Sequence, residues 1–98
     1  MSQPKEYYYS SIKKWIMMYD YLPDDRPQVQ AFRLAFEKAI KATAEMANGE
    51  LRIYAIESIL IDKTKTYEGV AQELHYERRT VQGWITSFVN LVGGLAGY

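Results

Sequence analysis

The stretch TYEGVAQELHYERRTVQGWITSFV, residues 66–89, decides how this chain is expected to fold. Apolar residues recur at helical spacing over residues 67–74 and 78–92, and the tripeptide HYE separates the two segments. Two short helices that pack at a steep angle need apolar facing sides and a small residue at their closest approach, where Ala71 stands. The pattern therefore predicts a C-terminal helix-turn-helix. Its inward positions are filled by Val70, Leu74, Tyr76, Val81 and Trp84.

Two residues depart from the usual form of such a motif. His75 stands where glycine or asparagine would turn the chain most easily, although histidine is also enriched at positive φ. Glu77 replaces the serine or threonine expected at the N-cap of the second helix. Its carboxylate can interact with the positive helix terminus, but it also brings negative charge close to the surface that would face DNA.

The outer face of the second helix carries the residues that would recognise DNA. Arginine can pair with guanine through two hydrogen bonds, glutamine can do the same with adenine, and a glycine lets the backbone approach closely. Lysine and threonine side chains before the first helix could reach phosphates. The alternative is that this polar face is merely solvated. The candidate DNA-contacting residues are Arg78, Arg79, Gln82, Gly83, Thr86, Lys63, Lys65 and Thr66, and Thr66 can also cap the helix that begins at Tyr67.

The first half of the chain predicts two further helices. Residues 5–22 place Tyr8, Ile12, Trp15 with Ile16, and Tyr19 on one stripe, and Tyr7, Tyr9, Met17 and Met18 widen the apolar surface. Such a helix is either sandwiched between neighbours or placed in an oligomer interface.

The break PDDRP, residues 23–27, separates that helix from the next. Asp24 or Asp25 can cap a helix over residues 26–47, with Pro27 in its first turn and Asn48-Gly49 at its end. Its apolar face is Val29, Phe32, Phe36, Ile40 and Thr43, and Arg33, Glu37 and Lys41 lie on another face.

Residues 51–62, LRIYAIESILID, fit a buried helix or a strand, and their length and helical neighbours favour the helix. The expected fold is therefore all-α, with about five helices. Residues 1–48 would form a helical hairpin for packing or oligomerisation, and residues 49–98 the helix-turn-helix region, together making one compact domain. The ending GGLAGY is expected to fray or to dock loosely.

Composition excludes several functional classes. The chain has no cysteine and one histidine, which removes thiolate nucleophiles, disulfides and the usual zinc sites. The sequence contains no nucleophile elbow that could work with His75 and no phosphate-binding loop. We therefore expect that the protein is not an enzyme and binds neither a cofactor nor a metal. Twelve basic and twelve acidic residues give zero net charge, so DNA contact must come from a local patch. The N-terminus resembles neither a secretory signal nor a membrane span, and a bacterial cytoplasm fits.

Residues 51–98 resemble phage transcriptional activators of the RinA type, which are related in pattern to ArpU-like phage regulators. The shared features are the T-x-E-x-(I/V)-A-x-x-L segment, RRTV at the start of the recognition helix, its tryptophan, the F-V pair and the G-x-x-G-Y ending. RIYAIESILIDK is placed like a helix that packs on the motif in sigma-factor region-four-like domains.

The resemblance implies a phage or prophage protein that binds promoter DNA, activates late genes and works with host RNA polymerase. Arg78, Arg79, Gln82 and Thr86 would carry recognition. A homodimer would place two such helices on successive major-groove turns. Two alternatives stay open: a small terminase subunit that loads DNA for packaging, and a protein-binding module that uses the Tyr/Trp/Met face of residues 7–22.

Overall fold

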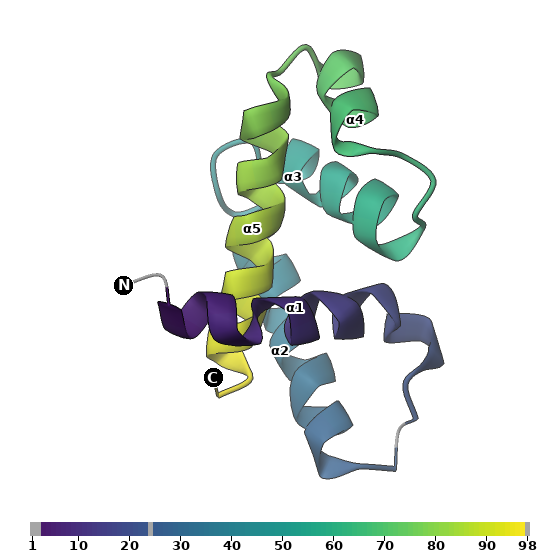
Figure 1. The fold of residues 1–98 in the computed structure, drawn as a ribbon, viewed down its shortest axis with the longest axis vertical. Coiled ribbons are helices and arrows are strands. Elements are labelled where there is room, and N and C mark those ends of the chain that lie inside the picture. The colour runs from purple at the N-terminus through teal and green to yellow at the C-terminus, as the bar shows by residue number, and fades with distance from the viewer. Residues whose placement is uncertain (1–2, 24, 98) are drawn as a thin grey trace.

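The computed structural model describes residues 3–23 and 25–97, with side chains from Tyr8 onward. These residues form five α-helices, a short 3-10 helix and one π-helical turn, and the described ranges contain no strand (Figure 1). The all-α prediction is confirmed. In chain order the elements are α1 Gln3–Met17, η1 Tyr19–Tyr21, α2 Pro27–Ala44, α3 Gly49–Ile56, η2 Glu57–Ile61, α4 Tyr67–Leu74 and α5 Arg78–Leu95.

Helix α5 is the axis of the bundle, and it packs against each of the other four α-helices. Figure 1 shows α1 crossing in front of the C-terminal half of α5, with α2 passing behind this crossing. Helices α3 and α4 lie beside the N-terminal half of α5. The two halves of α5 therefore have different neighbours.

Two apolar clusters follow from this arrangement. The first joins α1, α2, the end of α3, η2 and α5 from Ile85 onward, and each large side chain buried in it contributes about 1.5–3 kcal/mol. The second joins α3, α4 and the N-terminal half of α5. The first cluster contains Tyr8, Ile12, Ile16, Phe32, Ala35, Ala39, Ile56, Leu60, Ile85, Phe88, Val89 and Val92; the second contains Ala55, Val70, Ala71, Val81 and Trp84.

The apolar stripe predicted for the first helix is part of the core. Tyr8, Ile12 and Ile16 are buried, and Trp15 and Tyr19 are partly buried against the same cluster. Trp15 meets Phe32 of α2 edge-on, with 5.4 Å between ring centroids. Helix α1 is thus sandwiched within the chain. The helix ends at Met17, earlier than predicted, because a 3-10 turn replaces its last residues. The side chain of Tyr7 lies outside the described residues.

The predicted carboxylate cap of the second helix is wrong for Asp25. The N-cap of α2 is Arg26, no side chain caps it, and Pro27 occupies the first turn as predicted. Asp24 lies outside the described residues. Arg33 holds this break instead, because its guanidinium donates to the carbonyl oxygens of Tyr19 at 3.1 Å and Leu22 at 2.9 Å.

Asn48, predicted to end the second helix, has a left-handed conformation with φ of 59°, but it precedes α3 and does not end α2. Helix α2 ends at Ala44, and Gly49 begins α3 in close contact with that end. A Cβ at Gly49 would stand 2.3 Å from the carbonyl oxygen of Ala44. Only glycine fits this approach, so α3 can start directly beside the end of α2.

The ambiguous segment 51–62 is helical, as favoured, and the strand alternative is excluded. The helix widens into a π turn before it stops: Asp62 N donates to Glu57 O at 2.7 Å. The carbonyl of Ser58 then accepts from Thr64 N and Lys65 N, which fixes the loop before α4.

The ending GGLAGY was predicted to fray or to dock loosely, but its first three residues do neither, since α5 continues to Leu95 and Gly93 is buried. The aromatic ring of Tyr8 lies directly against Gly93, where a Cβ would stand 2.3 Å from Tyr8 Cε1. This contact holds the end of α5 against α1. Within the described residues, no helix combines the length and the apolar character that a bilayer span requires.

Candidate nucleic-acid interface

The turn between α4 and α5 is built by backbone hydrogen bonds around His75. His75 adopts φ 63° and ψ 39°, the left-handed conformation that the sequence required there. Tyr76 N donates to Ala71 O at 2.9 Å, and His75 N donates to Gln72 O at 3.3 Å. This pair of bonds is a Schellman motif, which satisfies the last carbonyls of α4 and reverses the chain within three residues.

Thr66 caps the N-terminus of α4, as predicted. Its hydroxyl oxygen accepts a hydrogen bond from Gly69 N at 3.0 Å and thereby satisfies one of the free amides of the first turn. Thr66 is exposed, but its side chain already has this structural role.

The predicted inward residues of the two helices pack together. Val70, Ala71, Val81 and Trp84 are buried in the second cluster. Leu74 and Tyr76 are partly buried against the same cluster, and the Tyr76 and Trp84 rings meet edge-on at 5.1 Å. Ala55 of α3 completes the contact, so α3 supports the pair from behind.

None of the described side chains caps the N-terminus of helix α5. Glu77 is its N-cap residue, in extended conformation, and its side chain makes no capping hydrogen bond. Only its carbonyl is used, accepting from Thr80 N at 3.0 Å and Val81 N at 3.3 Å. The carboxylate of Glu77 is therefore left on the surface beside the two arginines.

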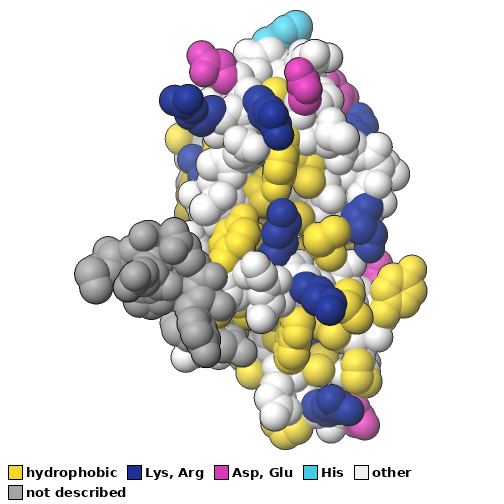
Figure 2. Space-filling view, viewed as in Figure 1, with side chains coloured by type: hydrophobic (Ala, Val, Ile, Leu, Met, Phe, Trp, Pro, Cys, Tyr) yellow, Lys and Arg dark blue, Asp and Glu magenta, His cyan; other side chains and the backbone are white. Residues whose placement is uncertain are grey.

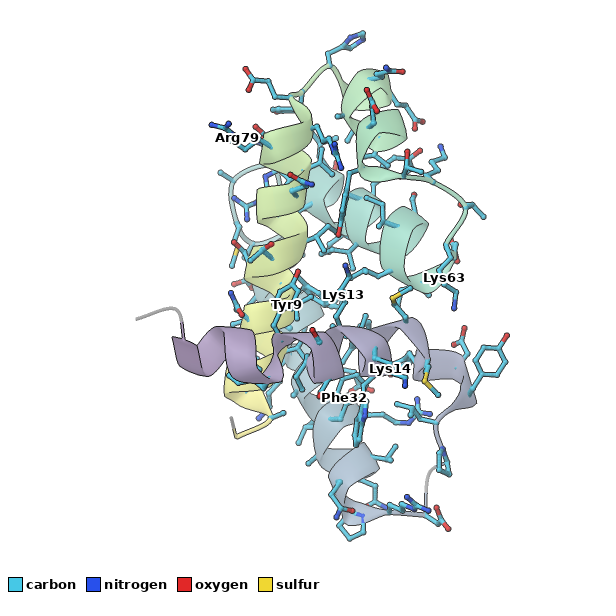
Figure 3. All side chains as sticks on the ribbon, viewed as in Figure 1. Tyr9, Lys13, Lys14, Phe32, Lys63 and Arg79 are labelled. Carbon is cyan, nitrogen blue, oxygen red and sulfur yellow. The ribbon has the colours of Figure 1, made fainter. Side chains whose placement is uncertain are left out.

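Of the predicted recognition residues, Arg79, Gly83 and Thr86 lie on the side of α5 opposite its buried stripe, whereas Arg78 and Gln82 stand in line with the buried Ile85 and Val89. Arg78, Arg79 and Thr86 are exposed, and Gln82 is half-buried at the edge of this face. Gly83 is open, with no atom within 4 Å of the position that a Cβ would take. Figure 3 shows Arg79 extending from the first turn of α5, away from the helices behind it. We name the segment 78–86 on this side the outer face of α5.

The two predicted phosphate lysines have partners inside the molecule. Lys65 Nζ lies 2.8 Å from Glu73 Oε1 and also donates to the Tyr54 hydroxyl, which in turn donates to Glu73 Oε2 at 2.6 Å. The hydrogen bond to Lys65, followed by that from Tyr54, lowers the pKa of Glu73, and the hydrogen bond to Glu73 raises the pKa of Lys65. Lys63 donates to the carbonyl of Met17 at 2.7 Å.

Tyr9 of α1 lies beside the outer face and Lys13 stands next to it on α1, where it reaches α4; neither was predicted to contribute to this site. The Tyr9 hydroxyl is 3.5 Å from the Thr86 hydroxyl, and Lys13 Nζ donates to the Tyr67 hydroxyl at 3.1 Å. Figure 3 shows Tyr9 and Lys13 next to each other where α1 crosses α5. From the sequence, Tyr9 was expected only to widen the apolar surface of the first helix.

Although the net charge of the chain is zero, basic side chains gather on this side of the molecule. Figure 2 shows Lys and Arg side chains running down the middle of the face on which α1 crosses α5. Among the described residues, no group of three or more His, Asp or Glu side chains could hold a metal ion. Comparisons with protein-family models, curated proteins and solved structures found no match to this chain.

Proposed function

We propose that the chain binds double-stranded DNA, with α4 and α5 acting as a helix-turn-helix whose outer face enters the major groove. The observation that supports this most directly is the division of α5 into two sides. Val81 and Trp84 fix one side to α4 and α3, and Arg79 extends from the opposite side, away from the helices behind it, next to the exposed Arg78 on the first turn. Arginines on the first turn of such a helix reach base edges and phosphates.

The biological role that we propose comes from the resemblance of residues 51–98 to RinA-type and ArpU-like regulators. In that role the protein is a transcriptional regulator of a phage or prophage, an activator of late genes in the cytoplasm of the bacterial host, and a partner of host RNA polymerase. No step of this role requires catalysis or a cofactor.

Affinity considerations favour a homodimer for this role. A single neutral domain with a few phosphate contacts binds nonspecific DNA at about 10⁻⁴–10⁻⁶ M. The exposed carboxylate of Glu77 weakens binding further, because it repels the phosphates nearest the arginines. Two copies on half-sites about 34 Å apart would combine their contacts on one side of the duplex.

The test is a selection of duplexes from a random-sequence pool, followed by fluorescence anisotropy on the selected duplex. Replacing Arg78 and Arg79 together by alanine should weaken binding strongly, since each base-contacting arginine contributes about 1–3 kcal/mol. The matched control replaces Lys38 and Lys41, two exposed cations of α2, and removes the same charge elsewhere. Equal binding by the arginine variant and the wild type across salt concentrations would show that the outer face does not read DNA.

A second candidate function is protein binding through a groove between α1 and the start of α2. This groove has a volume of about 780 Å³ and is lined largely by Trp15, Met18, Leu22, Pro23 and Val29. Substitution of Met18 by serine should leave DNA binding unchanged if the groove serves a protein partner. The mass in solution separates a dimer from a ring of many copies, which would favour a packaging role.

A further inference from the structure

Helix α1 limits how much of α5 is available to a partner. Tyr9 lies against Thr86, and about two turns further along α5 the ring of Tyr8 covers Gly93. The outer face is therefore open from Arg78 to Thr86, which corresponds to about 12 Å of helix at 1.5 Å per residue. Beyond Thr86, any partner that approaches α5 from this side meets α1.

This length is comparable to the dimensions of the DNA major groove. The groove is about 12 Å wide and about 8.5 Å deep. A helix that enters with its N-terminal turn first reaches the base edges near Arg78 and Arg79, and by Thr86 it has left the groove floor. The residues beside Thr86 then stand at the rim of the groove, where the sugar-phosphate backbone runs.

We propose that Tyr9 and Lys13 of α1 contact the phosphodiester backbone at this rim, as part of the DNA-binding surface. This inference rests on the function proposed above. A phenolic hydroxyl can donate to a phosphate oxygen, and a lysine ammonium adds an ionic contact that carries no sequence information. Helix α1, which otherwise contributes core residues, thus gains a direct role in affinity.

The charge of Lys13 is available for such a contact. Its Nζ has three hydrogens, and one is donated to the neutral hydroxyl of Tyr67. Within the described part of the chain no carboxylate lies in ion-pair distance of Lys13, whereas Lys65 is paired with Glu73. Lys63 is held at the carbonyl of Met17. Of these three lysines, Lys13 is the one that stands next to Tyr9, where α1 crosses α5.

A salt titration on a random-sequence duplex of about 24 base pairs isolates this contact, because phosphate contacts do not depend on sequence. Each one contributes about 0.9 to the slope of log K against log salt, equivalent to a roughly 3.5-fold change in affinity between 50 and 200 mM salt. Between 50 and 200 mM salt, the affinity of Lys13→Ala should therefore fall by a factor that is about 3.5 times smaller than the factor for the wild type. Tyr9→Phe should weaken binding and leave the slope unchanged. Lys38→Ala, on α2, is the charge-matched control and should behave as wild type.

The outcomes separate this inference from the proposed function. A wild-type slope and affinity for both Lys13→Ala and Tyr9→Phe, together with weak binding by the Arg78 and Arg79 double variant, overturns the role of α1 and leaves the proposed function standing. Equal slope changes in Lys13→Ala and Lys38→Ala also overturn it, because they reveal an effect of net charge alone. Absence of wild-type binding to any duplex removes both proposals.

Folding of the variants is checked by the helical circular dichroism signal. Should Lys13→Ala lose that signal, Lys13→Gln and Lys13→Arg make the same comparison with side chains that can still donate to Tyr67. The arginine variant is expected to keep the wild-type slope, and the glutamine variant to show the reduced one. Identical slopes for these two variants contradict the proposal.

Discussion

Replacing Gly93 by alanine tests the contact that locks α1 onto α5. The added Cβ would stand 2.3 Å from Cε1 of Tyr8 and 3.0 Å from its Cδ1 and Cζ. Carbon atoms pack at about 3.5–4.0 Å, so the ring must move by roughly 1 Å or more. Tyr8 is only 9% exposed and belongs to the first apolar cluster, so moving its ring disturbs the core.

The neighbouring Gly94 provides the control for this substitution. Both glycines lie in α5, but nothing lies within 4 Å of a Cβ at Gly94. Alanine improves helix propensity by up to about 1 kcal/mol at either position. Overpacking costs about 1–3 kcal/mol and applies only to Gly93. The free energy of unfolding of Gly93→Ala should therefore lie about 1–3 kcal/mol below that of Gly94→Ala.

Urea denaturation followed by circular dichroism measures this difference, and thermal melting should show it as roughly 4–8 °C per kcal/mol. Adding Tyr8→Leu removes the ring and should reduce the cost of Gly93→Ala, which a double-mutant cycle reports as a coupling energy. If Gly93→Ala and Gly94→Ala are equally stable, the close approach of Tyr8 to α5 is refuted.

Three further predictions concern the α4–α5 turn and its surroundings. Thr66→Ala should lower the free energy of unfolding by about 1 kcal/mol in urea denaturation, because the bond to Gly69 N is lost, whereas Thr64→Ala, without such a bond, should change little. His75→Gly should raise the melting temperature and increase the free energy of unfolding by up to about 1 kcal/mol, since glycine adopts the positive φ without a Cβ clash. A lower melting temperature than that of the wild type would contradict this. Glu73→Gln should be slightly less stable than wild type at neutral pH and equally stable in acid. The folded-state pKa of Glu73 lies below its ordinary value of 4.5, so its contribution is present above that value and disappears as the pH falls through the folded-state pKa. The pKa of Lys65 is raised, so Lys65 stays charged and stabilises the contact until the pH rises through its folded-state pKa. Added salt should reduce the difference in stability between Glu73→Gln and the wild type at neutral pH, because the Lys65–Glu73 pair is exposed.

The parts of the fold that could be predicted from the sequence are those with local causes. The left-handed turn at His75, the Thr66 cap and the bounds of α4 depend on residues within one or two turns of each other, and all three were predicted. The facing residues of α4 and α5 were also predicted, because helical spacing alone determines which side chains share a face.

The remaining features depend on contacts between segments distant in the sequence. From the sequence, Gly93 and Gly94 are both expected to belong to the C-terminal tail. Gly93 is part of the core only because Tyr8, which lies 85 positions earlier in the sequence, packs against it. From the sequence, Lys63 is expected to be a free lysine in a loop, but its ammonium group donates a hydrogen bond to the carbonyl of Met17. In the same way, no pattern within 78–92 indicates that α1 crosses α5 at Thr86.

The position of α5 in both apolar clusters bears on the cooperativity of the whole chain. Val81 and Trp84 belong to one cluster, while Ile85 and Phe88, on the next turn, belong to the other. If either cluster unfolds, α5 loses part of its packing, and the other cluster, which is built on the same helix, is destabilised. The two clusters are therefore expected to unfold together. Unfolding should then be a single two-state transition. A fragment limited to residues 49–98 would leave Phe88 without its partners on α1 and α2, and the surface that we propose to bind DNA cannot be separated from the N-terminal helices that hold it in shape.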